Sequence, residues 1–404
     1  MRLATDPVAE RSLHYGYPNA GLAAVELWLA EPPECSVQDR VRVASRSLEP
    51  AETIDLGVQT VQRYRVPPGH VLRVDWAFRS LRPHLDDGGG GSAGLPGLSP
   101  GERSFYLESS PQIPRHARIE AEARRLAGNV SDPLALAQGF FRSVATEYQY
   151  AYPVRRRGAL EMLASRRGDC GQFVSLFVAL CRAAEIPSRV LVGTLLTPSL
   201  DQAHAWAEIW VDGVGWVPAD PALGNALAHS HLPGAGDPNR AFGQLERGYF
   251  AFSIGFDIAL GDPYGAAVRP STLPARIGPR LAFGGESLSW GFATLQGRVP
   301  YLQPVYPRCY PGKGVNALLR CSPLGHWSLD AKWLPWALAQ DVLEQTWFLV
   351  ALLLVLLGLI AANWSTAIAA CCVAAVFALA IARLGIRAWL RHQPRRAPAR
   401  SSPS

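Results

Sequence analysis

Short apolar runs, rather than a long helical period, characterise the N-terminal quarter of the chain. Three of these runs have the length of β-strands and lie at residues 23–30, 60–66 and 71–78. In the third run, LRVDWAF alternates apolar with polar residues, which is typical of a strand with one buried face. Pro-Pro and Gly clusters between the runs indicate turns. We therefore predict a β-sandwich-like domain over residues 1–112, with a last strand at 105–107 and a flexible loop at 86–101.

A different pattern follows this region, because helical segments now alternate with strand-like runs. The predicted helices cover residues 114–127, 131–148, 159–165 and 170–184. The first ends at Gly128-Asn129, a typical C-cap, and the second opens with Asp132-Pro133, which suits a first helical turn. Strands are predicted at 189–196, 203–211 and 216–219. Residues 113–265 are thus expected to form an α+β domain.

The C-terminal part is strongly apolar and contains no charged residue between positions 345 and 382. As one helix, residues 347–382 would measure about 54 Å at about 1.5 Å per residue. A bilayer core is only about 30 Å thick. We therefore predict a transmembrane two-helix hairpin over 345–383 that turns at Asn363-Trp364-Ser365. A buried pair of apolar helices is the alternative. Residues 266–344, rich in Pro and Gly, are expected to be irregular and suggest no role.

Charge supports an anchor at the inner membrane and argues against a nucleic-acid partner. The formal charge is +6, but six arginines lie in the last 22 residues without any acid among them. The rest of the chain carries as many basic as acidic residues, so it has no basic surface of the kind that binds nucleic acid. Residues 384–404 are expected to form a basic, disordered tail. Because positive segments stay in the cytoplasm and no signal peptide is evident, we predict that the part of the chain before the hairpin faces the cytoplasm.

Cys170 begins a strongly apolar helical segment, directly after Gly168-Asp169. Unpaired backbone N–H groups and the helix dipole favour an anion at such a position. A thiolate is therefore favoured there, and the same N–H groups can receive the oxyanion of a tetrahedral intermediate. Gly168 and Gly171 leave room for a substrate carbonyl. Asp169 either opposes the thiolate by its charge or caps the helix. Cys181, inside the apolar helix, is expected to be a small buried side chain.

The segment AHAWAEIWVDGVGWVPADP at residues 203–221 places a histidine and an acid on two neighbouring strands. Alternation puts His204, Trp206, Glu208 and Trp210 on one strand face, directed toward a cleft or solvent. Asp212 to Gly215 form a hairpin turn. If even positions pair with even positions, Asp220 lies within side-chain reach of His204. A carboxylate there would hold the imidazole in one tautomer.

These motifs together resemble the bacterial transglutaminase-like superfamily, which is akin to papain-type cysteine proteases. The resemblance rests on R-x-G-D-C at Cys170, on H-A-W-A-E at His204 and on G-W-V-P-x-D-P at Asp220. It extends to residues 241–260, which are similar to the segment that closes the domain, and to the preceding β-domain. The resemblance implies a Cys-His-Asp triad and an aromatic residue in the cleft, for which Tyr148, Tyr150 and Tyr152 are candidates. We expect six residues in or near these motifs to shape the cleft: Gly168, Gly171, Gln172, Trp206, Glu208 and Tyr150.

The resemblance implies a membrane-anchored cysteine hydrolase or acyltransferase that acts on peptide or protein amides through a thioester. Attack by water on that thioester would give a peptidase or amidase, whereas attack by an amine would give a crosslinking enzyme. Hydrolysis is at least as plausible as crosslinking in a bacterial member. The alternative is a catalytically inactive protein that keeps the fold as a peptide-binding module or scaffold.

The remaining composition adds no further chemistry. Acidic clusters and paired C-x-x-C units are absent from the sequence, so neither a metal nor another cofactor is expected. The seven cysteines show no disulfide framework, although Cys309 and Cys321 would be able to pair in an oxidising compartment. The sequence does not determine the oligomeric state.

Overall fold

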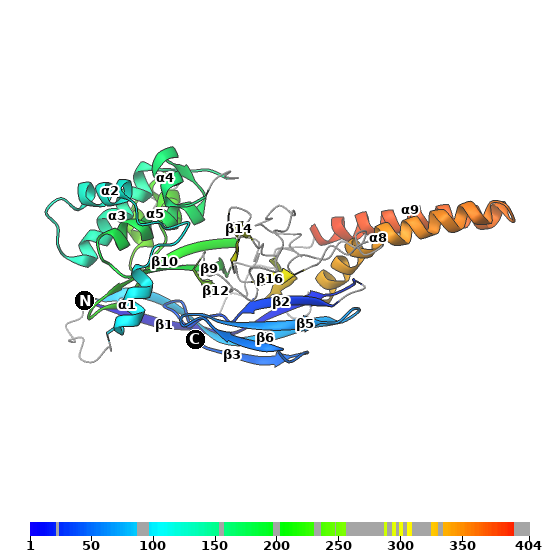
Figure 1. Ribbon diagram of the computed structural model, residues 1–404, viewed down its shortest axis with the longest axis horizontal. Coiled ribbons are helices and arrows are strands. Elements are labelled where there is room, and N and C mark those ends of the chain that lie inside the picture. Colours follow the sequence, from blue (N-terminus) through cyan, green and yellow to red (C-terminus); the bar gives the residue numbers. More distant parts are fainter. Residues whose placement is uncertain are drawn as a thin grey trace, which may run out of the picture.

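The computed structural model places a β-rich body between a group of helices and a projecting helical hairpin (Figure 1). It describes residues 1–21, 24–86, 97–152, 157–196, 203–229, 236–246, 248–255, 287–288, 293–295, 299–301, 305–308, 325–329 and 334–391. Helices α2 to α5 lie at one end of the molecule and the α8–α9 hairpin extends from the other.

Two long antiparallel strands form the centre of the first N-terminal sheet. β1 (Arg2–Pro18) pairs along its length with β6 (Val71–Asp86), whose other edge pairs with β3 (Gln38–Arg46). Alternate residues of β6 are buried, as its sequence predicts: Leu72, Val74, Trp76 and Phe78. The sequence did not predict β1, because the first half of this strand is mostly exposed or half-exposed and lacks an apolar alternation.

The second N-terminal sheet contains β2 (Val25–Ala30), β5 (Thr60–Val66) and β4 (Glu52–Asp55). β2 and β5 are two of the strands predicted from their apolar runs. Leu27 and Tyr64 of this sheet join Leu13 and Trp76 of the first sheet in one buried core. Burial of these faces supplies the main driving force for association of the two sheets.

Segments from the C-terminal half extend both N-terminal sheets. β16 (Val305–Arg308) pairs with β2, and β17 (His326–Ser328) pairs with β1. β13 (Ser287–Leu288) follows β17 at the edge, and β14 (Ala293–Leu295) pairs with β15 (Val299–Tyr301). The expectation of an irregular segment over 266–344 is therefore wrong for these strands, which are too short to be read from sequence and depend on pairing with each other or with the existing sheet edges.

Trp327 secures this return of the chain to the N-terminal sheets. Its side chain is fully buried. The ring centroid lies 4.7 Å from that of Tyr15, 5.3 Å from that of Trp76 and 4.5 Å from that of Phe252. Such offset and tilted aromatic contacts add to the free energy gained by burying the rings.

The middle of the chain forms the α+β unit predicted from its pattern. Its helices are α2 (Ala117–Ala127), α3 (Pro133–Glu147), α4 (Ala159–Ser165), α5 (Cys170–Ala183) and α6 (Pro221–Ala228), followed by a short 3₁₀ helix (Pro238–Ala241). The sheet has the order β11 (Gly215–Ala219), β10 (Ala203–Val211), β9 (Ser188–Leu195) and β12 (Tyr249–Ile254). β7 (Gln149–Tyr150) and β8 (Arg167–Gly168) form a short parallel pair. Helix α5 is buried almost all round, because it lies between the sheet and the other helices.

One predicted strand is a helix instead. Residues 105–107, expected to be extended, are the last turn of α1 (Pro100–Leu107), which also takes up part of the predicted loop. Ser99 and Glu102 form a reciprocal capping box, and Pro100 occupies the first turn, where its missing N–H costs nothing. These capping signals outweigh the β propensity of Phe105 and Tyr106.

The C-terminal hairpin consists of α8 (Leu334–Ala361) and α9 (Thr366–Arg391), with a turn at the predicted Asn363-Trp364-Ser365. Both helices are longer than predicted. Because α9 continues to Arg391, the prediction of disorder is wrong for residues 384–391, and residues 392–404 lie outside the described part. Several large apolar side chains of the hairpin are exposed, among them Leu353, Leu359, Ile360, Phe377 and Ile381.

Counting only residues that the structure describes, we find no helix long and apolar enough to cross a membrane. The transmembrane hairpin thus stays a prediction from the sequence.

We predict that Trp327→Ala lowers the free energy of unfolding by about 3–5 kcal/mol, because it empties a fully buried aromatic site. Denaturant titration of the full chain in mild detergent measures the effect. Trp364→Ala is the matched control, since this tryptophan is 88% exposed and its removal should change stability by less than about 0.5 kcal/mol. Equal effects of the two substitutions would contradict the packing of 326–328 on the N-terminal sheet.

Candidate active site

Cys170 is the first residue of α5, at the position predicted from the sequence. Asp169 is the N-cap: its side chain accepts from the backbone N–H of Gln172, while the Gln172 side chain accepts from the backbone N–H of Asp169. Arg157 forms an ion pair with Asp169, with 3.0 Å between Nη2 and Oδ2. Of the two roles open to Asp169, the structure therefore shows the cap, and the neighbouring guanidinium offsets its charge beside the thiol.

His204 and Asp220 form a short hydrogen-bonded ion pair. The register of β10 and β11 pairs Trp210 with Trp216 and Glu208 with Pro218, so even positions do pair with even positions. His204 Nε2 lies 2.6 Å from Asp220 Oδ2. The Asp220 side chain is fully buried, whereas 14% of the His204 side chain is exposed. Asp220 is also the N-cap of α6, where Oδ1 accepts from the backbone N–H of Leu223 at 2.9 Å.

The other ring nitrogen of His204, Nδ1, is free to interact with Cys170. The ring of His204 is hydrogen-bonded to the Asp220 carboxylate, and the Cys170 side chain lies close enough to the ring to be among the groups that raise its pKa. Because Nε2 faces Asp220, Nδ1 is left for the sulfur. Burial would lower the pKa of His204, but the charge of Asp220, the hydrogen bond to Asp220 and the nearby Cys170 outweigh it and raise the pKa to about 10. The imidazole is thus set up to hold a proton taken from the thiol.

Tyr150 is the tyrosine of the YQYAY stretch that meets the nucleophile. The parallel pairing of β7 with β8 places Tyr150 opposite Gly168. Burial, followed by the nearby Cys170 and Asp169, raises the pKa of this tyrosine. Tyr148 is buried beneath the Arg166 guanidinium, and Tyr152 is 61% exposed. Of the three tyrosines, the structure places Tyr150 beside the start of α5.

Part of this chain matches the sequence model of a known protein family. Residues 120–221 match the sequence model of the transglutaminase-like superfamily, and they include all three predicted triad residues. The chain contains a transglutaminase-like domain. The resemblance recognised in the sequence is thereby confirmed. A search of curated proteins gave no match.

Solved structures provide weaker likenesses. A candidate cysteine protease from Cytophaga hutchinsonii is 15% identical, with a TM-score of 0.42, and the match covers 63% of this chain and 84% of that one. The periplasmic domain of TgpA from Pseudomonas aeruginosa is 19% identical, with a TM-score of 0.34, and covers 54% and 89% of the two chains. Because both TM-scores are low, the proposals below rest on the site itself.

The smaller residues expected to shape the cleft of the transglutaminase-like domain adjoin the nucleophile. Gly168 is buried, and a Cβ there would lie 2.7 Å from both Gln172 Cβ and Met162 Sδ, so no larger residue fits without displacement. Gln172 is buried and acts in the capping box. Gly171 accepts a hydrogen bond from Ser175 at its carbonyl, 2.8 Å away. These residues shape the start of α5, and therefore the backbone around Cys170.

Trp206 lies fully buried beside His204. The two rings are nearly parallel, with 6.4 Å between their centroids. Gly193 on β9 leaves the space for this tryptophan, since a Cβ there would lie 2.6 Å from the indole and 2.0 Å from the carbonyl oxygen of Phe250. Trp206 thus borders the His204 ring on one side of the site.

Glu208 lies away from the triad, so the expectation that its whole strand face borders the cleft or solvent is wrong. Its carboxylate is fully buried and forms an ion pair with Arg189, at 2.6 Å from Nη2. Its other oxygen accepts from the backbone N–H of Ser36 in the N-terminal region, at 2.9 Å. Arg189 in turn stacks on Trp216, 4.1 Å from the ring centroid. Ser36 of the N-terminal region thus contacts this part of the strand, which a pattern within one strand does not reveal.

Two residues at the site were not predicted. Arg157 compensates Asp169, and Tyr249 of β12 donates its hydroxyl proton to Asp220 Oδ2 at 2.8 Å. Arg157 is the last of three consecutive arginines, and this run does not indicate which acid any one of them pairs with. Tyr249 lies within the closing segment noted in the sequence, but its pairing with Asp220 depends on how β12 joins the sheet.

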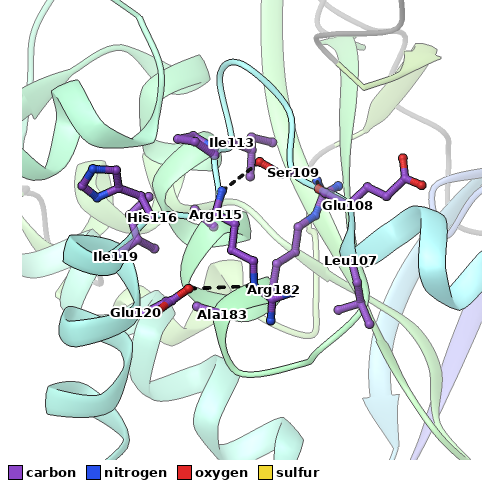
Figure 2. Close-up of a pocket in the computed structure, with 12 residues that line it drawn as sticks. Leu107, Glu108, Ser109, Ile113, Arg115, His116, Ile119, Glu120, Arg182 and Ala183 are labelled. Carbon is purple, nitrogen blue, oxygen red and sulfur yellow. Dashed lines mark hydrogen bonds and ion pairs between the residues drawn. The ribbon is translucent and has the colours of Figure 1, made fainter.

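Other polar sites in the described residues are sparse. No group of three or more His, Cys, Asp or Glu residues suited to a metal occurs among them. A shallow pocket lies at the opposite end of α5, where Arg115, Arg182 and Glu120 surround it, and Figure 2 shows that none of the triad residues lines it. Cys181 is fully buried, and burial raises the pKa of its thiol, which fits the inert role expected for it. Cys309 and Cys321 lie outside the described residues.

We predict that Asp220→Asn lowers the pKa of His204 from about 10 to near its ordinary value of about 6.5 or below, because burial is then opposed by Cys170 without the carboxylate. NMR titration of the histidine ring protons measures this, with Asp212→Asn in the exposed hairpin turn as the matched control. In the unchanged protein the raised pKa adds stability that is fully present below about pH 6.5 and is lost as the pH rises through about 10. Titration of His204 near 6.5 in the unchanged protein would refute the ion pair.

Proposed function

We propose that this protein is a cysteine hydrolase or acyltransferase in which Cys170, His204 and Asp220 act as a catalytic triad on peptide amides. One observation carries the proposal: the imidazole of His204 pairs with the buried Asp220 carboxylate and lies beside Cys170. A nucleophile, a base and a group that orients the base are the parts that acyl transfer requires.

In the first half-reaction, His204 Nδ1 holds the proton that the thiol has given up while Cys170 Sγ attacks the substrate carbonyl. Asp220 stabilises the resulting imidazolium and keeps the Nε2 proton directed toward itself. The substrate oxygen, now negative, would accept from the Cys170 backbone N–H at the start of α5. The imidazolium then gives its proton to the departing amine, which leaves an acyl thioester on Cys170.

In the second half-reaction, His204 deprotonates the acceptor that attacks the thioester. Water releases a carboxylic acid, and an amine forms a new amide; both return the proton through His204 to the Cys170 thiolate. The triad handles both acceptors in the same way. We therefore assign hydrolysis at least the same weight as crosslinking.

We expect Cys170 in the full chain to react with iodoacetamide at neutral pH faster than a free thiol such as N-acetylcysteine, and His204→Ala to slow it by about 10²-fold or more. Mass spectrometry of the labelled cysteines gives the rates. His70→Ala, at an exposed histidine of the N-terminal region, is the control. Unchanged labelling in the His204 variant would favour the inactive scaffold. Incubation with a peptide mixture and a fluorescent primary amine then separates cleavage from amine incorporation.

We also propose that the α8–α9 hairpin attaches the protein to the inner membrane with the catalytic body on the cytoplasmic side. The uncharged run at 345–382, the arginines that follow it and the exposed apolar side chains of the hairpin support this. The substrate would then be a peptide or protein near the membrane.

The paired change Leu353→Arg and Phe377→Arg should move the protein from the membrane pellet to the supernatant after carbonate extraction, since both side chains are exposed and a charge in the bilayer costs about 3 kcal/mol on insertion scales. Leu353→Ala with Phe377→Ala is the matched control. A reporter fused after Ser404 tests the orientation: fluorescence of a green fluorescent protein supports the cytoplasmic side, and active alkaline phosphatase would contradict it.

A further inference from the structure

Two donors share one oxygen of the Asp220 carboxylate. His204 Nε2 lies 2.6 Å from Oδ2, and the Tyr249 hydroxyl donates to the same atom at 2.8 Å. Oδ1 accepts from the backbone N–H of Leu223. Since the Asp220 side chain is fully buried, these groups take over the task that water performs at an exposed carboxylate.

Tyr249 is held in place by the sheet and not by the loop that carries Asp220. It belongs to β12, where it pairs with Leu195 of β9, and its side chain is fully buried. Its ring lies 5.0 Å from that of Trp206 at 65° and 6.0 Å from that of His204. The tyrosine also lies beyond residues 120–221, which match the superfamily model. A separate strand thus brings the hydroxyl to the acid of the triad.

The donors differ in what happens to them during the reaction. His204 is an imidazolium after it takes the thiol proton and is neutral after it gives that proton away. In the neutral state Asp220 has lost its cationic partner, although it stays buried and ionised. The Tyr249 hydroxyl is unaffected by this change and keeps one oxygen of the carboxylate hydrogen-bonded throughout. Burial raises the pKa of Asp220, and the charge of His204 together with hydrogen bonds from His204, Leu223 and Tyr249 outweighs it, so that the pKa is lowered overall.

We propose that Tyr249 is a positioning residue of the acyl-transfer site, whose hydroxyl fixes the Asp220 carboxylate so that His204 presents Nδ1 to Cys170 in both of its protonation states. This inference rests on the proposed function, because it concerns how the triad is kept ready between its two half-reactions. Tyr249 acts through Asp220 and does not contact the reacting atoms.

The test is the pH dependence of Cys170 alkylation by iodoacetamide in the full chain in mild detergent. Tyr249→Phe keeps the ring and removes one donor to the carboxylate, so protonation of Asp220 becomes easier. We expect the acid-side midpoint of the rate profile to move up by about half to one pH unit, which corresponds to one neutral hydrogen bond. A tyrosine that only packs in the core would change the amount of folded protein and leave this midpoint where it is.

Two further variants make the result specific. Tyr249→3-fluorotyrosine keeps the side chain and makes the hydroxyl a stronger donor, so the midpoint should move down, opposite to Tyr249→Phe. This variant also serves if Tyr249→Phe does not fold. Tyr64→Phe removes the hydroxyl of another fully buried tyrosine, which donates to Gln62 in the N-terminal sheet, and should leave the midpoint unchanged.

The outcomes distinguish failure of the role of Tyr249 from failure of the proposed acyl-transfer function. If Cys170 reacts no faster than a free thiol and His204→Ala has no effect, the proposed function fails. If Cys170 is reactive and depends on His204, but both Tyr249 variants give the midpoint of the unchanged protein, only the role of Tyr249 is refuted. Shifts in opposite directions for the two variants support it.

Discussion

The buried carboxylate of Asp220 is the constraint on which the rest of the site depends. An ionised group without water is stable only when donors surround it, and here three elements supply them: β10 through His204, β12 through Tyr249 and the start of α6 through Leu223. The same residue caps α6 and orients the imidazole. The sheet, the helix that follows it and the proposed base are therefore fixed by one side chain, and a change at this position affects folding and chemistry together.

The proposed nucleophile, Cys170, lies at the start of a helix. Asp169 and Gln172 close the capping box, and Arg157 offsets the charge that the cap places beside the thiol. The capping box fixes the backbone at Cys170, and Tyr150 lies nearby. Because residues 171–181 of α5 are buried, packing holds the helix that begins at Cys170 in place.

The N-terminal sheets act as a support for the transglutaminase-like domain. Glu208 and Arg189 form a buried pair whose remaining acceptor binds the backbone of Ser36. The Gln38 side chain both donates to and accepts from the backbone of Ala251, at 2.9 and 2.8 Å, and so pairs with β12 as a strand would. Since β12 also carries Tyr249, this contact links the N-terminal region to the strand that reaches the proposed acid of the triad.

The sequence by itself determined the features that are local or strictly periodic. A cap and an apolar run placed Cys170 at a helix start, and alternation around a short turn placed Asp220 within reach of His204, because hairpin register follows from a few residues. The uncharged run likewise predicted two helices and their turn. Tertiary structure alone decided the rest. Tyr249 reaches Asp220 through sheet order, and Glu208 binds the backbone of Ser36, more than a hundred residues earlier in the chain. The strands at 305–308 and 326–328 form because the edges of the two N-terminal sheets offer them pairing partners. These contacts join segments distant in sequence, and no pattern within one segment records the partner that satisfies a buried polar group or an open strand edge.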